Sequence, residues 1–427
     1  MFTPRFSKTT PLALALTLLL CVSAPCQEAP PDLVLDRKVA ELEKLKAAFK
    51  ADAKTPEVTR KLAQAMSDLA TYYSQRGQKG DLDRAFTYFT STLELRELIL
   101  KTTNGEPSVA RTISASLNEL AALLVQRGQS GDFEKALEHV TRGLEIAESL
   151  RKKHPDAPDF ARDAAVSLDR LGSLLVRRAG GGDGDKALEY FTRALEITDA
   201  AHKLKPDSSD TERDLALSLE RMASIIHARG DGNDEAKIVS HLTRSVELRE
   251  SVSKKKPEST SASHELSVSL EKLADFLFER GNPSDTEKIK AHYGKCLAIR
   301  EGLLKAMPNN GNAARALCVG LNKLADFLAT IGNDEDVPTI LRHFTRDLDI
   351  SEKLLAANPT SAESARDVVV SRYKLGKFTE SIGKPEDSEK HFRACFELLK
   401  NCTAGKMTFD APTMKLLEDL KTHFDEK

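Results

Sequence analysis

The sequence predicts an all-α protein, a right-handed α-solenoid in which antiparallel helix hairpins stack on one another. The main observation is a repeat of 51 residues: the segment SLNELAALLVQRG starts at position 116, and copies of it start at 167, 218, 269 and 320. Weaker copies start at 65 and 371. A unit that recurs at a fixed spacing is typical of one structural element stacked on itself. Aromatic residues make up only 5% of the chain and Trp is absent, so aliphatic side chains must fill the core.

Each repeat begins with a first helix, here called helix A. In the copy at 159–179, Leu168, Leu171, Leu174 and Leu175 recur at the spacing of one helix face. The pattern ends at the glycines 180–182, and glycine commonly follows the end of a helix. An arginine precedes this end in five copies, at Arg76, Arg127, Arg178, Arg229 and Arg280. A cation in the last turn interacts favourably with the negative end of the helix dipole.

A second helix, helix B, follows in each repeat. An aspartate recurs every 51 residues just before it, at Asp81, Asp132, Asp183, Asp234, Asp285 and Asp336. Aspartate is a favoured N-cap residue, so we expect these carboxylates to accept the free N–H groups at the start of helix B. The helix is expected to end before a proline that recurs at Pro155, Pro206, Pro257, Pro308 and Pro359. Each repeat is therefore predicted to be a hairpin of two helices of about 20 residues.

The predicted array has a leading half-repeat, seven A–B pairs and a final helix. The leading helix B spans 34–52, and a helix at about 411–425 covers the exposed end, as terminal repeats of such arrays must. The last A–B loop is expected to be three residues shorter than the others, because Phe392 lies 48 residues after Phe344. The expected division is a leader at 1–26, a linker at 27–33, one repeat array at 34–405 and a capping helix at 406–427.

The first 26 residues predict export. Arg5 and Lys8 precede an apolar run at 11–22, and small residues follow it, as in a secretory signal peptide. The run is too short to span a bilayer, which needs about 20 apolar residues. We therefore expect a periplasmic or extracellular protein with no membrane span in the mature chain. Cleavage after Ala24 and cleavage after Cys26 both stay open.

Four cysteines follow the leader, at Cys296, Cys318, Cys395 and Cys402. Export permits disulfides, and Cys296 and Cys318 are expected on consecutive helices. Cys296 also occupies the period position of Ala194 and Gly143, where a small buried residue is needed, and a free cysteine suits such a position. A Cys296–Cys318 disulfide and two free thiols therefore both stay open.

These repeats resemble the tetratricopeptide repeat (TPR). One copy has Leu171-Gly172 and Leu175 in helix A, then Ala187, Phe191 and Ala194 in helix B, then Pro206. The usual unit has about 34 residues, so this unit departs from it through longer helices and a longer loop. It is similar to long-period bacterial arrays of the superfamily, and the resemblance covers about 34–405. It implies a scaffold that binds proteins or peptides, with helix A lining a concave face.

The sequence predicts no enzyme, cofactor or metal site. It has no HExxH, CxxC, phosphate-binding loop or GxSxG motif. One position of helix B carries His139, His241, His292, His343 and His391. Tyrosine replaces histidine at this position in other repeats, so we interpret the row as packing between repeats. The formal net charge of −2 predicts no binding to nucleic acid.

The candidate partner-binding residues lie on rows of helix A that we expect to be exposed. The rows contribute Glu220, Ser224, Glu271, Asp275, Asn322 and Asp326. The four acidic residues among them favour a basic or polar peptide segment.

The sequence thus predicts a non-enzymatic exported scaffold that binds a protein or peptide partner of unknown identity. The alternative is a structural or self-assembling protein of the cell envelope. In that case the apolar side chains of Phe278 and Val176, expected to be exposed, would drive self-association. The oligomeric state stays open.

Overall fold

The computed structural model describes residues 32–52, 55–230 and 234–425, and this part of the chain consists of helices and short connections. The proposed leader at 1–26 and its cleavage site lie outside the described residues. No strand occurs within these ranges. The all-α prediction is therefore confirmed for the described chain.

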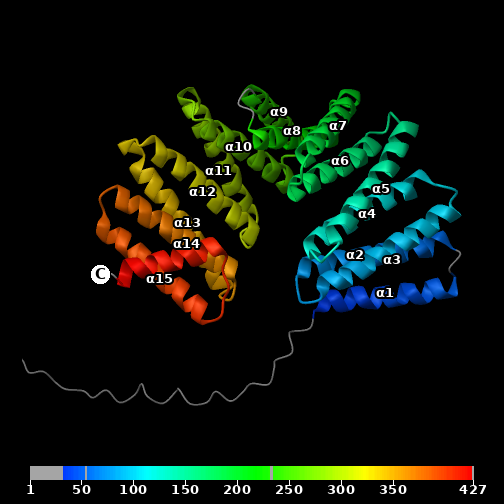
Figure 1. Cartoon of the computed structure of the whole chain (residues 1–427), viewed down its shortest axis with the longest axis horizontal. Helices are drawn as coiled ribbons and strands as arrows, with labels where there is room; N and C mark the ends of the chain where they lie inside the picture. The colour runs from blue at the N-terminus through cyan, green and yellow to red at the C-terminus, as the bar shows by residue number, and fades with distance from the viewer. Residues whose placement is uncertain (1–31, 53–54, 231–233, 426–427) are drawn as a thin grey trace, which may run out of the picture. The chain divides into compact units, whose positions relative to one another are not determined.

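The predicted order of helices is confirmed. A leading helix α1 (Leu33–Ala51) precedes seven helix hairpins in the described ranges (Figure 1). In chain order, the A and B helices are α2 (Pro56–Arg76) and α3 (Asp81–Thr102), α4 (Pro107–Arg127) and α5 (Asp132–Lys153), α6 (Pro158–Arg178) and α7 (Asp183–Leu204), α8 (Ser209–Arg229) and α9 (Glu235–Lys255), α10 (Thr260–Arg280) and α11 (Thr286–Ala306), α12 (Gly311–Ile331) and α13 (Val337–Ala357), and α14 (Ala362–Ser381) and α15 (Pro385–Ala404). The final helix α16 (Ala411–Asp425) follows, where the capping helix is predicted.

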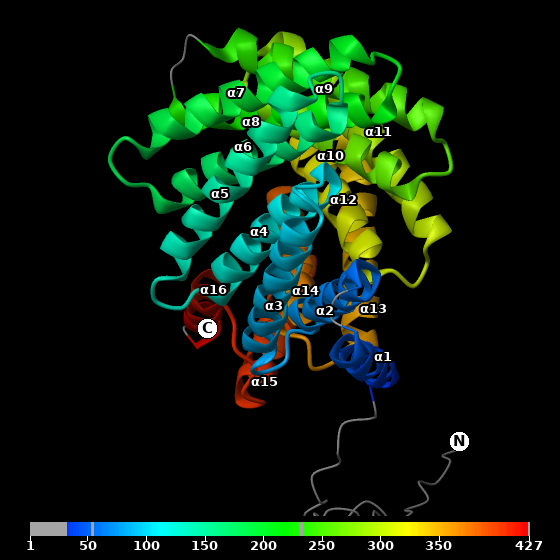
Figure 2. The ribbon, with the colours of Figure 1, turned by 90° about the vertical axis from the view of Figure 1, so that its right-hand side faces the viewer.

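The chain divides into two compact units, and the division falls within the array predicted as one domain. The first unit ends at Phe133 and the second begins at Glu134, inside α5. In the second unit the hairpins follow one another in chain order, from green to red in Figures 1 and 2. Short 3₁₀ turns, η2 (Pro283–Asp285) and η3 (Asp334–Asp336), precede α11 and α13. α15 begins 48 residues after α13, as predicted, because the connection at 382–384 is two residues shorter than that at 332–336 and α14 is one residue shorter than α12.

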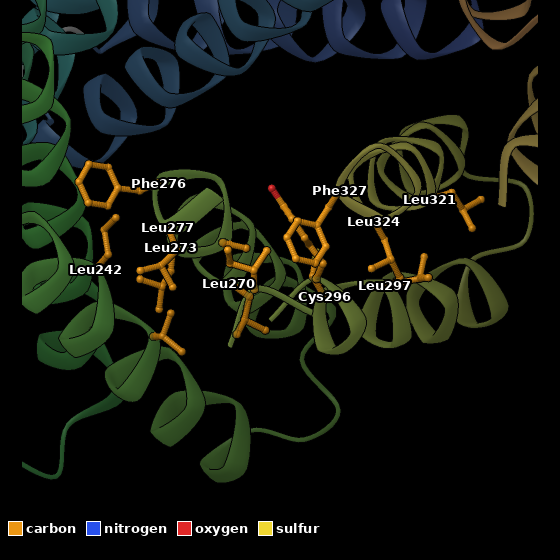
Figure 3. Packing of buried hydrophobic residues seen from close by; sticks show 14 of the residues in the cluster. Leu242, Leu270, Leu273, Phe276, Leu277, Cys296, Leu297, Leu321, Leu324 and Phe327 are labelled. Carbon is orange, nitrogen blue, oxygen red and sulfur yellow. The ribbon is translucent and has the colours of Figure 1, made fainter. Parts of the chain in front are cut away.

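The core of the second unit is a continuous apolar cluster that successive hairpins share. Leu242 of α9, Leu270 of α10, Leu297 of α11 and Leu324 of α12 belong to the same cluster and are all buried (Figure 3). Each hairpin therefore covers apolar surface that its neighbour would otherwise expose to water. Burial of this kind stabilises the fold by about 25 cal/mol per Å² of apolar area.

Six A helices end at a residue in the left-handed conformation, as the glycines predict, whereas α14 ends at Ile382 with a φ of −96° and the left-handed Gly383 follows it. Gly77, Gly128, Gly230, Gly281 and Gly332 have φ between 65° and 75°. In one repeat, Ala179 takes this position with a φ of 51°. Glycine has no Cβ to clash in this conformation, whereas alanine does.

The B helices end before proline, as predicted. Lys205, Lys256, Met307 and Asn358 each precede a proline and leave the helical region, with φ between −130° and −140°. Proline disfavours the helical conformation of the residue before it. The proline therefore determines where helix B stops.

The predicted capping role of the recurrent aspartates is wrong. Asp183 is the first residue of α7, and its carboxylate accepts from Arg178 Nε at 2.8 Å, from Arg178 Nη2 at 2.7 Å and from the backbone N–H of Gly180 at 2.8 Å. The Arg178 guanidinium holds the pKa of Asp183 at about 2, well below its usual value. Asp234, Asp285 and Asp336 do occupy N-cap positions, but their side chains make no cap hydrogen bond.

The same arrangement recurs in other repeats. Arg76 binds Asp81, Arg127 binds Asp132, and Arg280 binds Asp285, each across the A–B loop. A planar guanidinium bonds a carboxylate through two parallel N–H groups, which outweighs one bond to a helix N–H. The Arg–Asp pair therefore closes the hairpin instead of capping helix B.

We predict that Ala179→Gly stabilises the protein by about 1 kcal/mol, because it removes the steric cost of the left-handed conformation. The control is the reverse change at an equivalent position: Gly230→Ala should destabilise the protein by a similar amount. Urea unfolding followed by circular dichroism measures both. An Ala179→Gly variant that unfolds at the same or a lower urea concentration than the unchanged protein would contradict this account of the helix end.

Candidate functional site

The candidate site is the solvent-exposed side of five A helices in the second unit, α6, α8, α10, α12 and α14. Ion pairs join consecutive A helices near their N-terminal ends. Arg162 Nε lies 2.7 Å from Asp214 Oδ2, and Arg315 Nε lies 2.9 Å from Asp367 Oδ2. Arg213 of α8 pairs with Glu265 of α10 in the same way. We call the surface formed by these helices the A-helix face.

Glu220 does not lie on this surface, which corrects the expectation that it is exposed. Its side chain is buried, with 4% exposed. Ser245 and Ser269 donate to its Oε1 at 2.8 and 2.6 Å, and the Lys272 ammonium pairs with Oε2. Burial opposes ionisation of this carboxyl, but Lys272 and Ser269 together hold its pKa below the usual value. Glu220 therefore joins α8 to α9 and α10 and is not free for a partner.

The other three acidic candidates are also paired within the chain. Glu271 Oε2 lies 2.5 Å from Arg300 Nη1, and Asp326 Oδ2 lies 2.6 Å from Lys374 Nζ. Asp275 accepts from Lys323 at 2.9 Å and from the Tyr293 hydroxyl at 2.6 Å. Because each charge has a partner in a neighbouring helix, these acids give little electrostatic reason to expect a basic ligand. Their role in binding stays a prediction.

The two neutral candidates differ in exposure. Ser224 is exposed, and its hydroxyl donates to the carbonyl oxygen of Glu220 at 2.9 Å. Asn322 is half-buried, and its Nδ2 donates to the carbonyl oxygen of Cys318 at 3.0 Å. The Oδ1 atom of Asn322 is buried and accepts no hydrogen bond within the described residues. Asn322 therefore has an unused acceptor.

The sequence analysis missed a row of aliphatic residues at one period position of the A helices. The row consists of Val166, Leu217, Val268, Val319 and Val370. Four of them are exposed, with fractions of 37%, 37%, 42% and 42% for Val166, Leu217, Val319 and Val370, and Val268 is half-buried. We call this row the aliphatic stripe. The 51-residue period already contains the signal, since the position is apolar in five consecutive copies, but only the structure shows that it faces water.

Val176 and Phe278, the two side chains expected to drive self-association, differ in exposure. Val176 is 45% exposed, as expected. Phe278 is half-buried, and its ring meets that of Phe327 edge-on with the ring centres 5.3 Å apart. The expectation that Phe278 is exposed is therefore wrong, because the next hairpin covers it.

The cysteines and histidines take part in packing. Cys296 and Cys318 are buried free thiols. Of the two alternatives, the structure therefore has the free thiols and not the disulfide. Burial lowers the pKa of the imidazoles in the histidine row, at His139, His241, His292, His343 and His391. Within the described ranges, no group of three or more His, Cys, Asp or Glu side chains has the geometry to hold a metal ion. No helix in these ranges has the length and apolar character needed to cross a membrane.

Comparison with known proteins gives likenesses at low identity. No protein family model matches the chain. A stretch of 154 residues is 27% identical to Protein NCA1 of Arabidopsis thaliana, and the match covers 34% of this chain and 34% of that protein. The match thus spans about a third of the length of this relative.

Among solved structures, the S. pombe nuclear import adaptor Nro1 aligns with a TM-score of 0.50 and 10% identity. The alignment covers 73% of this chain and 99% of Nro1. A tetratricopeptide repeat protein from Parabacteroides merdae aligns over 84% of this chain with a TM-score of 0.35 and 13% identity. The likeness to Nro1 supports a helical-repeat fold, and at this identity it shows the fold alone.

One carboxyl of the A helices, that of Asp169, is bound by no basic side chain within the described residues. Asp169 of α6 stands one period before Glu220, but no lysine pairs with it as Lys272 pairs with Glu220. Its Oδ1 is buried and accepts no hydrogen bond in the described chain. Burial raises the pKa of Asp169 to about 6, and the charge of Arg221 only partly opposes the shift.

We predict that Asp169 makes the stability of the protein fall as the pH rises. The pKa of this carboxyl is near 3.8 in the unfolded chain and about 6 in the folded protein. The folded state therefore keeps its full stability below pH 3.8 and loses part of it as the pH rises through 6. At about 1.4 kcal/mol per pKa unit, the loss approaches roughly 3 kcal/mol. Asp169→Asn should therefore raise the melting temperature at pH 7.5 more than at pH 4.

Thermal unfolding across this pH range, followed by circular dichroism, measures the effect. Asp156→Asn, at an exposed position of the same repeat, serves as the control and should change neither value. An equal shift of the Asp169→Asn melting temperature at both pH values would contradict the role assigned to burial.

Proposed function

We propose that this protein is a non-enzymatic scaffold that binds an extended segment of a partner protein along the aliphatic stripe of its second unit. The observation that carries the proposal is the stripe itself: five consecutive A helices place an aliphatic side chain at the same position, and four of these side chains are exposed. Single exposed aliphatic residues are ordinary, but a row at a fixed spacing is a surface.

The charges next to the stripe suit such a binding surface. Basic residues occupy the positions one turn before and one turn after it, and Arg162, Arg315, Lys323 and Lys374 among them pair with acids of neighbouring A helices. Paired charges resist displacement and leave apolar contact as the main attraction. The result is an apolar row with a polar rim, which is the usual anatomy of a protein interface.

The helices that carry the stripe are preformed, so binding would cost little ordering of the scaffold. A fold shared with adaptor proteins such as Nro1 also supports a role in holding partners.

We further propose that the protein acts outside the cytoplasm, in the periplasm or the extracellular space of a bacterium. The support is the leader-like pattern at 1–26 and the similarity of the repeat to long-period bacterial arrays. The second candidate function, self-assembly in the cell envelope, has less support. Of the two side chains expected to drive it, only Val176 is exposed.

We predict that the protein selects peptides with alternating aliphatic residues from a random peptide library. Replacing two stripe residues together, Val319→Asp and Val370→Asp, should weaken binding of the selected peptides by roughly tenfold to a hundredfold, because two apolar contacts are lost. Fluorescence anisotropy with a labelled selected peptide measures the affinity.

The matched control is Leu204→Asp, which changes an exposed leucine at the end of α7 and should leave the affinity unchanged. Unchanged binding by the stripe variant would refute the proposal. The proposal would also be refuted if the library yielded no peptide and light scattering showed that the protein associates into larger species. That result would favour self-assembly.

A further inference from the structure

Two consecutive repeats of the second unit place an arginine in the same buried slot. The slot lies between two successive A helices, and the B helix between them in sequence forms its floor. Arg249 of α9 and Arg300 of α11 lie one period apart on that floor. Both are buried, with exposed fractions of 7% for Arg249 and 3% for Arg300. We call this position the inter-repeat slot.

The slot at Arg300 shows what holds a guanidinium there. Nη1 donates to Glu271 Oε2 of α10 at 2.5 Å and to the carbonyl oxygen of Ala316 of α12 at 3.0 Å. Nε lies 3.4 Å from Ser267 Oγ. The slot therefore combines an acidic group, a backbone carbonyl and a small polar side chain around a buried cation.

The next repeat keeps the slot but lacks the arginine. Ser351 of α13 occupies the position one period after Arg300, and a cleft of about 540 Å³ lies there between α12, α13, α14 and the start of α16. Val319 and Val370 of the aliphatic stripe line the same cleft. This cleft is larger than the one of about 250 Å³ that Arg300 lines, and serine fills less of it than arginine would.

The floor of this cleft is acidic. Asp347 stands at the period position of Ser245 and Cys296, so a carboxylate replaces a small neutral side chain. Asp347 is 1% exposed, and its buried Oδ2 accepts no hydrogen bond within the described residues. The Oδ1 of Asn322, at the position of Glu271, is likewise without a donor there. Burial raises the pKa of Asp347, and the nearby groups of Ser371, Asn322 and Cys318 only partly oppose the rise.

The remaining charges of the cleft do not compensate Asp347. Four carboxylates and two arginines line it, a formal excess of two negative charges. Arg315 is bound to Asp367 and Glu363, and Arg366 is bound to Asp410. Lys374, which also acts on Asp347 electrostatically, is bound to Asp326. The cleft thus has charge complementary to a cation.

We propose that the cleft floored by Asp347 receives an arginine side chain of the bound partner. This inference rests on the proposed function, and it identifies the chemistry of the partner: an extended segment whose aliphatic residues lie on Val319 and Val370 and whose arginine enters between them. The incoming guanidinium takes the place that Arg300 and Arg249 occupy in the two preceding slots. Its planar N–H groups reach the free oxygens of Asp347 and Asn322.

The first test needs no partner. Ser351→Arg supplies the arginine from the chain itself, as in the two preceding repeats. It should raise the melting temperature by roughly 1–2 °C, a small shift because the melting temperature of a large chain responds weakly to one added contact. The rise should disappear when Asp347→Asn is added. A Ser351→Arg variant that melts at or below the temperature of the unchanged protein would overturn the inference, and so would a rise that is the same with Asp347→Asn.

The second test uses a pair of labelled heptapeptides in which aliphatic residues alternate with threonine around a central arginine or a central citrulline. Citrulline has the shape of arginine without its charge. The full mature chain should bind the arginine peptide roughly tenfold more tightly, as expected for one charge-assisted hydrogen bond. Asp347→Asn should remove this difference, whereas Asp349→Asn, at an exposed position on the same helix, should keep it.

The outcomes separate the two proposals. Equal affinity for both peptides, lost with Val319→Asp and Val370→Asp, would overturn the arginine site and leave the proposed function standing. A central lysine that binds as tightly as arginine would overturn the specific role of the guanidinium. If Ser351→Arg stabilises the protein but neither peptide binds, the cleft accepts an arginine of the chain itself. That result would refute binding of a partner at the aliphatic stripe, and it would refute the arginine site for a partner as well.

Discussion

The structure depends on apolar contact between consecutive hairpins. A helix hairpin alone leaves one side of its aliphatic residues in water, and the cluster that includes Leu242, Leu270, Leu297 and Leu324 exists only because neighbours supply the missing cover. This constraint explains why core positions repeat so closely. It also explains why the positions that vary between copies are those that face water or the slots between helices.

Two series of ion pairs accompany these contacts. On the A helices, partners lie 52 residues apart, as in Arg162–Asp214 and Arg315–Asp367. On the B helices they lie 45 residues apart, in Arg193–Glu148, Arg244–Asp199, Lys295–Glu250 and Arg346–Glu301. Pairs this exposed contribute little stability each. Their consequence is that the charges in these two series already have partners within the chain, whereas the aliphatic stripe is exposed to water.

The inter-repeat slots show how a repeated fold acquires a local site. One period position of helix B reads Ala194, Ser245, Cys296 and Asp347, and another reads Thr198, Arg249, Arg300 and Ser351. The fold accepts each of these side chains because the slot lies between rigid helices. In the repeat with Asp347 and Ser351, both positions differ from the preceding repeat, and the proposed cation comes from a partner instead of from the chain. The surrounding helices keep their arrangement. A binding site arises without any change of the backbone plan.

The sequence alone determined the helices, their order and their ends, because apolar periodicity, glycine and proline act over a few residues. The leading helix, the seven hairpins and α16 could all be predicted. The site could be predicted only in part. The sequence placed the candidate residues on helix A, but it did not show that Glu220, Glu271, Asp275 and Asp326 are bound by basic residues from other helices. Which charge meets which partner, and whether Val319 or Asp347 faces water, depends on how side chains from distant positions pack, so only the tertiary structure decided it.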